Sequence, residues 1–214
     1  MTKLKICGLT SLEDARFCSG AGADYLGFIC YPGSPRYITP KGIKSIADWI
    51  FGSELVGVFV DESADHVNEV AEAAGLHVVQ LHGDEPSWIC ADVEKPVIKA
   101  FRVKPTDTAD ALRYQFDDYA DHVDYFLLDA YHDNLYGGTG KVFNWDIAKA
   151  LAADYPLFLA GGLSTENVID AIETVQPYAV DVSSSVEMAP GVKDFTKLTA
   201  FFDTFNVLRD DSVI

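Results

Sequence analysis

Two side chains in this sequence could exchange protons with a substrate, and each stands at the end of a short apolar run. Cys7 ends the run Lys3–Cys7 and precedes Gly8, and Asp129 ends the run Tyr125–Asp129. A thiolate can act as a general base or a nucleophile, and a nearby helix start favours its negative charge. The alternative is that Cys7 is a small apolar filler. An unpaired buried carboxylate is costly, so Asp129 either performs acid–base chemistry or ties loop amides together.

Two further polar side chains could contact a ligand. Arg36 lies in a Ser-Pro-Arg segment, and a guanidinium can bind a carboxylate or phosphate with two parallel hydrogen bonds. It could equally be a surface arginine. His82 follows another apolar run and precedes Gly83. It could contact a ligand, or its hydrogen bonds could be made by neighbouring protein groups.

Glycine- and serine-rich segments follow the last two apolar runs. They are Gly161-Gly162 and Ser183-Ser184-Ser185. Exposed backbone N–H groups, the positive field of a helix start and serine hydroxyls together suit a phosphate, and this pair of loops is a frequent phosphate site in barrels. Ordinary turn chemistry is the alternative.

Two connections are longer than packing requires, Cys30–Pro40 and Ala130–Phe143. Long loops in a compact domain are often functional. The second contains Gly137–Gly140, which could form a backbone cradle or a flexible lid. It lacks the spacing and the lysine of a P-loop, so we exclude a nucleotide site there.

Eight apolar runs alternate with helix-like stretches, and this rhythm predicts the elements that position these residues. Strand–helix alternation favours parallel pairing with helices covering the sheet, and eight units favour closure. We therefore expect an α/β fold, a single (β/α)8 TIM barrel whose chemistry lies at the carboxyl ends of the strands. The runs are Lys3–Cys7, Asp24–Phe28, Leu55–Val60, Val78–Leu81, Val97–Phe101, Tyr125–Asp129, Leu157–Ala160 and Tyr178–Val182.

Capping signals predict where several helices begin. A capping box spans Thr10–Glu13, and a cap, an acid and a proline occur together at Asp84–Pro86. Asn144 is a candidate cap for the sixth helix, and Ser164–Glu166 for the seventh. In Phe195–Phe205, apolar residues recur at helical spacing, so this face should pack on the barrel.

The length and composition of the chain limit the classes of protein to which it can belong. The chain has 214 residues, 49% of them hydrophobic, which suits one domain over residues 1–214 with a short tail at the end. No apolar run approaches the ~20 residues of a membrane span, and the first strand begins at once, so we expect a cytoplasmic protein. The net charge of −17 argues against nucleic acid or an anionic membrane as a partner.

The four cysteines lack CxxC or metal-like spacing, and no dinucleotide or nucleophile-elbow motif occurs. Cys18 and Cys90 fall in helical patterns and are expected to be buried, inert thiols. We expect no disulfide framework and no metal site.

The chain resembles the phosphoribosylanthranilate isomerases of tryptophan biosynthesis along nearly its whole length. Each motif is weak alone, but their order and barrel positions together are specific. The motifs are KICGLT at Lys5–Thr10, SPRY at Ser34–Tyr37, VGVFV at Val56–Val60, VQLHG at Val79–Gly83, LLDA at Leu127–Ala130, GGTG with F-x-W at Gly137–Trp145, LAGGL at Leu159–Leu163, DVSSxVE at Asp181–Glu187 and PGVKD at Pro190–Asp194.

The resemblance implies an Amadori rearrangement of an aminoaldose phosphosugar to an aminoketose, without cofactor or metal. Asp129 matches the family's general acid, which protonates the furanose oxygen. Cys7 matches the general base, which removes the proton on sugar C2 and must be a thiolate to do so. The implied partner is a small-molecule phosphosugar, and the enzyme would be a monomer or a homodimer.

The resemblance also assigns binding roles. Arg36 would bind the anthranilate carboxylate, and His82 and Asp181 match polar positions lining the family's site. The phosphate would be held by Gly161, Gly162, Ser183, Ser184 and Ser185.

Two positions depart from the family pattern. Ser185 replaces a glycine; if that position has positive φ or touches the phosphate, serine introduces strain or crowding, and otherwise it could donate a hydrogen bond. We expect modest weakening of phosphate affinity at most. Cys30 replaces a common aromatic residue, which we interpret as packing without a catalytic role.

Other functions compete with this interpretation because fold alone does not decide function. Indoleglycerol-phosphate synthases would be expected to use lysine and glutamate in the barrel mouth, and histidine-pathway isomerases an aspartate at the position of Cys7. A non-catalytic phosphate-binding scaffold is a different class. The presence of Cys7, Asp129 and Arg36 together favours the isomerase.

Overall fold

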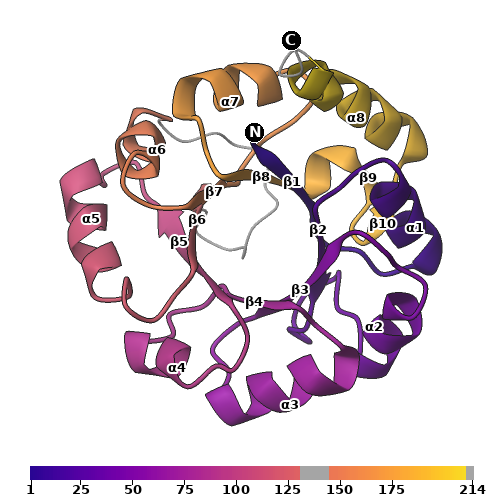
Figure 1. Cartoon of the computed structure of the whole chain (residues 1–214), viewed down its shortest axis with the longest axis horizontal. Helices are drawn as coiled ribbons and strands as arrows, with labels where there is room; N and C mark the ends of the chain where they lie inside the picture. Colours follow the sequence, from indigo (N-terminus) through magenta and orange to yellow (C-terminus); the bar gives the residue numbers. More distant parts are fainter. Residues whose placement is uncertain (131–144, 211–214) are drawn as a thin grey trace.

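The strands of this protein close into a parallel barrel in chain order, with β8 pairing β1 (Figure 1). The computed structural model describes residues 1–130 and 145–210. The eight strands of the expected TIM barrel are confirmed, most within one residue of the predicted runs. They are β1 (Lys3–Ile6), β2 (Tyr25–Ile29), β3 (Glu54–Phe59), β4 (Val78–Leu81), β5 (Val97–Val103), β6 (Tyr125–Ala130), β7 (Leu157–Leu159) and β8 (Ala179–Val182).

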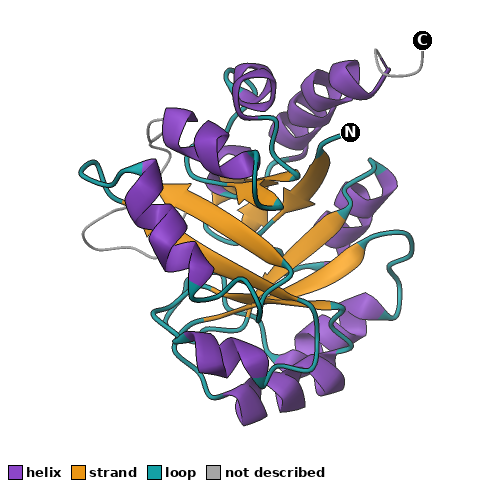
Figure 2. Ribbon diagram, turned by 60° about the vertical axis from the view of Figure 1, so that its left-hand side comes forward, coloured by secondary structure: helices purple, strands orange, loops and turns teal. Residues whose placement is uncertain are grey.

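Helices form the outer layer around these strands (Figure 2). A short antiparallel hairpin follows β8 and lies beside α1 in Figure 1. The helices are α1 (Leu12–Gly20), α2 (Pro40–Ala47), α3 (Ala64–Ala74), α4 (Ser87–Ala91), α5 (Ala109–Asp117), α6 (Trp145–Ala152), α7 (Val168–Val175) and α8 (Phe195–Asp210). The 3-10 helix η1 (Ser184–Val186) leads into the hairpin, which consists of β9 (Glu187–Ala189) and β10 (Val192–Lys193).

Side chains alternate between two separate cores, as the period of a strand requires. On β1, Leu4 and Ile6 pack in the shell between strands and helices, so Lys5 and Cys7 point into the barrel. The barrel interior is filled by Tyr25, Val56, Val78, Ile98, Ala100, Leu127, Phe158, Ala160 and Ala179. This packed interior leaves the carboxyl ends of the strands as the place for a site.

Three tyrosines fill the amino-terminal end of the barrel. The hydroxyl groups of Tyr25 and Tyr178 are 3.1 Å apart, and that of Tyr178 donates to Tyr125 at 3.4 Å. The Lys3 ammonium donates to the Tyr25 hydroxyl at 3.4 Å. The polar atoms of these large side chains are thus paired with one another where the barrel meets solvent.

The predicted capping box of the first helix is wrong by one residue. Ser11 is the N-cap, and its hydroxyl oxygen accepts from the backbone N–H of Asp14 at 3.1 Å. The Thr10 hydroxyl instead donates to the carbonyl of Gly191 at 2.5 Å. A long-range partner in the hairpin thus removes Thr10 from the cap.

The predicted caps of α4 and α7 are also wrong. Pro86 precedes α4 without a side-chain cap, because Asp84 pairs with Arg102 and Glu85 with Lys99, each at 2.7 Å. Before α7, the segment Ser164–Glu166 forms a turn, in which the Ser164 hydroxyl accepts from the Glu166 N–H at 3.3 Å. Asn144 lies outside the described residues.

The apolar face of the last helix is confirmed. Leu198, Phe201, Phe202 and Phe205 are buried, whereas Phe195 is 36% exposed and packs on the Phe17 ring at 4.9 Å. Among the described residues, which include all four cysteines, every cysteine is a free thiol, with Cys18 and Cys90 buried. No helix in the described part of the chain is long and apolar enough to cross a membrane.

Candidate active site

A cavity at the carboxyl ends of the strands gathers most of the residues predicted from the sequence. It is lined by Cys7, Arg36, His82, Asp129, Gly161, Gly162, Asp181, Ser183 and Ser184, together with Ile29, Tyr31, Ser34, Val58, Val60, Gln80, Ala160 and Leu163. Ser185 does not line it. Part of the loop Cys30–Pro40 thus lies on this face. Residues 131–143 of the other long loop, with the predicted cradle or lid Gly137–Gly140, lie outside the described residues.

Cys7 follows β1 and is 7% exposed. Its sulfur points toward Gly27 on β2, where a Cβ atom would lie 2.7 Å from Sγ. Any side chain at that position would displace the thiol. Burial raises the pKa of the Cys7 thiol, whereas the positive charges of Lys5 and Lys193 lower it and Asp181 raises it further. The net effect is an elevated pKa, so the resting group is a thiol.

A buried ion pair lies inside the barrel on the same face of β1 as Cys7. The Lys5 ammonium is 2.8 Å from Oδ2 of Asp181 on β8, and the side chains are 0% and 9% exposed. The other oxygen, Oδ1, has no hydrogen-bond partner among the described residues. Since Asp181 lines the cavity, this oxygen can accept a hydrogen bond from a ligand. Lys5 was not predicted as a site residue, although a charge within an apolar strand was the available signal.

Asp129 faces His82 across neighbouring parts of the cavity wall. Oδ2 of Asp129 lies 3.5 Å from Nε2 of His82, and Nδ1 of His82 lies 2.8 Å from the amide nitrogen of Gln80. Because an amide nitrogen only donates, Nδ1 is assigned as the acceptor and Nε2 carries the ring proton. The histidine is therefore set to present an N–H toward the carboxylate.

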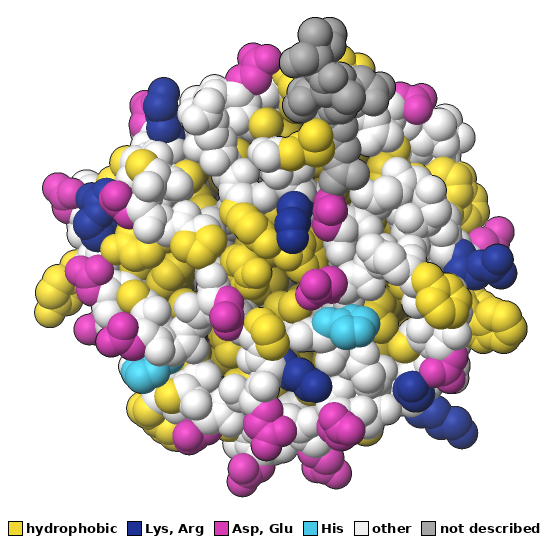
Figure 3. All heavy atoms as spheres, in the orientation of Figure 1, with side chains coloured by type: hydrophobic (Ala, Val, Ile, Leu, Met, Phe, Trp, Pro, Cys, Tyr) yellow, Lys and Arg dark blue, Asp and Glu magenta, His cyan; other side chains and the backbone are white. Residues whose placement is uncertain are grey.

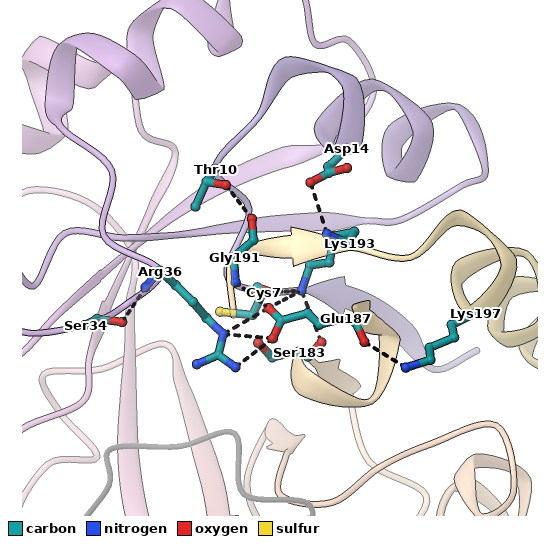
Figure 4. Close-up of polar contacts among 10 residues, drawn as sticks. All are labelled: Cys7, Thr10, Asp14, Ser34, Arg36, Ser183, Glu187, Gly191, Lys193 and Lys197. Carbon is teal, nitrogen blue, oxygen red and sulfur yellow. Dashed lines mark hydrogen bonds and ion pairs between the residues drawn. The ribbon is translucent and has the colours of Figure 1, made fainter. Parts of the chain in front are cut away.

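Arg36 is held by a carboxylate of the protein itself, which the sequence did not predict. Nε of Arg36 donates to Oε1 and Oε2 of Glu187 at 2.9 and 3.1 Å, and Nη2 donates to Oε2 at 2.7 Å. Figure 4 shows Glu187 between Arg36 and Lys193. Burial alone would raise the pKa of Glu187, but hydrogen bonds from Arg36 and the charge of Lys193 lower it overall, so the carboxylate is ionised.

The glycine-rich and serine-rich loops meet at one side of the cavity. Gly161 and Gly162 have φ values of +84° and +73°, a backbone conformation that favours glycine. Non-glycine residues with positive φ among the described residues are Asp61 and Gln176, so Ser185 is not strained. Of the alternatives considered for Ser185, backbone strain from a positive φ is therefore excluded, whereas the effect of Ser185 on phosphate affinity stays a prediction. Its hydroxyl is buried without a hydrogen-bond partner in the described part of the chain.

Within residues 1–130 and 145–210, no group of three or more His, Cys, Asp or Glu side chains could hold a metal ion. The cavity instead combines a thiol, a carboxylate, a guanidinium and a cradle of backbone amides. These groups define a TIM-barrel enzyme equipped for proton transfer on a small anionic ligand.

Comparison with known proteins identifies the family. The model of the N-(5'phosphoribosyl)anthranilate (PRA) isomerase family matches residues 4–204. The chain belongs to this family, and it is an isomerase of tryptophan biosynthesis.

Curated relatives carry the same name. The N-(5'-phosphoribosyl)anthranilate isomerase of Geobacter sulfurreducens is 49% identical over 205 residues, which cover 94% of this chain and 97% of the relative. That of Pelobacter propionicus is 44% identical over 213 residues, which cover 99% of each chain.

Solved structures agree with the fold. The phosphoribosyl anthranilate isomerase of Thermus thermophilus matches with a TM-score of 0.86 and 37% identity, covering 97% of this chain and 100% of that one. The enzyme of Thermotoga maritima gives a TM-score of 0.86 and 38% identity, covering 95% and 98% of the two chains.

Proposed function

We propose that Asp129 is the general acid and Cys7 the general base of the isomerisation of N-(5-phosphoribosyl)anthranilate. Their placement in one cavity, on β6 and after β1, is the observation that carries this assignment. Around the barrel, β7 and β8 separate β6 from β1 (Figure 1), so the two groups can approach a ligand from different directions.

The first step opens the furanose ring. Asp129, in its protonated form, donates to the ring oxygen while the nitrogen lone pair forms a C1=N bond and the C1–O bond breaks. The products are a protonated Schiff base, a free sugar hydroxyl and an Asp129 carboxylate. The Nε2–H of His82 can stabilise this carboxylate as its charge develops.

The second step moves the proton on C2. Cys7 first loses its thiol proton to solvent, because only the thiolate can act as the base. The Schiff base acidifies the C2 proton, the Cys7 thiolate removes it, and the electron pair of the C–H bond shifts to give an enaminol with a neutral nitrogen. Return of the thiol proton to C1 and transfer of the O2 proton to Asp129 then give the ketone and restore both groups to their starting states.

Binding groups that line the cavity orient the substrate. Arg36 binds the anthranilate carboxylate, and Gly161, Gly162, Ser183 and Ser184 hold the phosphate through backbone and hydroxyl donors. Ser185, whose side chain does not line the cavity, can contribute only its backbone N–H. Asp181 offers Oδ1 to a sugar hydroxyl. Support comes from a phosphoribosyl anthranilate isomerase solved in complex with reduced 1-(o-carboxyphenylamino)-1-deoxyribulose 5-phosphate, which matches this chain with a TM-score of 0.83 and 37% identity.

The relatives also bear on assembly and location. A Thermotoga maritima relative is described as dimeric. For this chain we retain both a monomer and a homodimer, which light scattering after size exclusion separates. A role in amino-acid biosynthesis supports a cytoplasmic location.

The test is turnover of freshly generated phosphoribosylanthranilate, followed by the loss of its fluorescence. We expect rapid loss with the wild type, and a fall of about 10²-fold or more in kcat for Cys7→Ala and for Asp129→Asn. Cys30→Ala is the matched control, because this half-buried thiol does not line the cavity and should keep wild-type turnover. Absence of turnover by folded wild type would refute the proposal and favour the histidine-pathway substrate.

A further inference from the structure

The hairpin β9–β10 carries two buried charges that the acid–base steps do not use. Glu187 is 6% exposed and Lys193 is 2% exposed, and their Cα atoms are paired across the hairpin. Burial of charged groups is costly unless they are paired and hydrogen-bonded. Their contacts show what the pairing achieves.

Glu187 occupies one edge of the Arg36 guanidinium. Its two oxygens take the N–H groups of Nε and one of Nη2, so the edge formed by Nη1 and Nη2 is left for another anion. Nη1 has no hydrogen-bond partner among the described residues, and Arg36 lines the cavity. A planar carboxylate can bind that edge with two parallel hydrogen bonds.

Lys193 in turn fixes Glu187. Its ammonium donates to Oε1 of Glu187 at 3.1 Å, to the carbonyl of Cys7 at 2.6 Å and to the carbonyl of Ser183 at 3.1 Å, which uses all three donors (Figure 4). The Gly191 N–H also donates to Oε1 at 3.3 Å. The carboxylate is thus anchored to the segments that carry the proposed base and the proposed phosphate loop.

Packing holds the other side of the arginine. A Cβ atom at Gly8 would lie 2.7 Å from Cδ of Arg36, so the aliphatic part of the side chain lies directly against the end of β1. With the stem packed and one edge paired, the guanidinium has little freedom to rotate.

We propose that Glu187, fixed by Lys193, is a positioning residue that presents the Nη1–Nη2 edge of Arg36 to the substrate carboxylate. It thereby sets the preference for an aromatic amine that bears a carboxylate. This inference rests on the proposed role of Arg36. Removing the negative charge of Glu187 strengthens the positive field in the cavity, which by itself would favour an anion. The proposal predicts the opposite, namely weaker binding of the substrate carboxylate.

The test compares two substrates prepared from ribose 5-phosphate, one with anthranilate and one with aniline, which lacks the carboxylate. Product is measured by chromatography. In Glu187→Gln we expect the KM of the carboxylated substrate to rise about tenfold and kcat to change less, because a bidentate contact loses its alignment. We expect kcat/KM for the aniline substrate to stay near the wild-type value. A fall in the KM of the carboxylated substrate, or an equal loss with both substrates, would overturn the proposal.

A double-variant cycle separates positioning from a structural role. In an Arg36→Met background, Glu187→Gln should no longer change the ratio of kcat/KM for the two substrates. If it still lowers the ratio, Glu187 does not act through Arg36 and the proposal is wrong. Asp84→Asn is the matched control, since Asp84 also pairs with an arginine at 2.7 Å but its side chain is 84% exposed and outside the cavity.

Two outcomes distinguish this inference from its foundation. A wild type without preference for the carboxylated substrate would overturn the role of Arg36 and this proposal together. A wild-type preference that Glu187→Gln leaves intact would overturn this proposal alone. If circular dichroism shows that Glu187→Gln does not fold, Glu187→Asp is tested instead. Aspartate keeps the negative charge but is one methylene shorter, so the charge lies farther from the guanidinium. An unchanged preference for the carboxylated substrate in that folded variant would refute the inference.

Discussion

The space for the proposed base is provided by a glycine on the neighbouring strand. A Cβ atom at Gly27 would lie 2.7 Å from Sγ, 3.0 Å from Cα and 3.1 Å from Cβ of Cys7, so the strand end itself must move. We expect Gly27→Ala to lower kcat/KM by about tenfold to 10²-fold, because a displacement near 1 Å is sufficient for such a loss. Overpacking should also cost about 1–3 kcal/mol in the free energy of unfolding.

The matched control is Gly20→Ala in α1, where nothing lies within 4 Å of the added Cβ atom. Steady-state kinetics and thermal melts of both variants give the comparison. Wild-type kcat/KM in Gly27→Ala would show that the thiol position is not critical.

The ion pair within the barrel tunes the proposed base. Burial is the main reason that the pKa of Cys7 is raised; the positive charge of Lys5 opposes this, and the negative charge of Asp181 adds to it. Removing the cation in Lys5→Met should therefore move the alkylation of Cys7 by iodoacetamide to higher pH, and Asp181→Asn should move it to lower pH. Mass spectrometry of the peptide that contains Cys7 isolates this reaction from the other thiols. Shifts in the same direction in both variants would contradict this electrostatic account.

At the scale of elements, substitutions of Ser185 in η1 test whether this residue affects the phosphate site. Its backbone does not have positive φ and its side chain does not line the cavity, so Ser185→Gly has no strain to relieve. We expect its KM to stay within about twofold of the wild type while stability falls by about 0.5–1 kcal/mol, because glycine loses more conformational freedom on folding. Ser185→Ala should gain about 1 kcal/mol by removing a buried hydroxyl without a described partner. Urea unfolding and KM measurements check both variants, and a large KM change in Ser185→Gly would restore the importance of a glycine there.

Strands were predictable from the sequence because their signal is local. Apolar runs such as Val78–Leu81 gave the strand bounds directly, and their alternation with helices gave the barrel. Helix starts were less predictable, because a cap depends on what else competes for its hydroxyl or carboxylate. Thr10 and Asp84 look like capping residues, but each instead pairs with a residue of another element, Gly191 and Arg102 respectively.

The same distinction applies to the site. Cys7 and Asp129 could be placed at strand ends, where barrels position chemistry. The supporting residues Lys5, Glu187 and Lys193 could not be predicted in this way, because their roles depend on partners from other parts of the chain. A charged residue inside an apolar run and a motif after the last strand were the available signals.

For the whole molecule, the excess of negative charge opposes the compact state. The net charge is −17, and Figure 3 shows acidic side chains spread over one face rather than gathered in one place. Added salt screens such repulsion, with a Debye length near 10 Å at 0.1 M. We therefore expect the melting temperature to rise as sodium chloride is raised from about 0.01 M to about 1 M. An equal concentration of an uncharged solute is the control, and a falling melting temperature would show that favourable ion pairs dominate instead.

The buried thiols and phenols make the fold sensitive to alkaline pH. Burial raises the pKa of Cys18 to about 12 and that of Cys90 to about 11, and the hydrogen bond with Tyr178 raises the pKa of Tyr125 to about 12. A group whose pKa is higher in the folded state stabilises the fold below its unfolded value, and this contribution is lost as pH rises toward the folded value. From about pH 9 to pH 11, the Cys18 thiol should therefore lower the free energy of unfolding by about 1.4 kcal/mol per pH unit, and the Cys90 thiol by less as pH approaches 11. Urea unfolding across this range measures the slope, which Cys18→Ala should make shallower. Ser53→Ala is the control, because it removes a buried hydroxyl that does not titrate and should lower stability by the same amount at every pH. An unchanged slope in Cys18→Ala would show that the Cys18 thiol ionises equally in the folded and unfolded states.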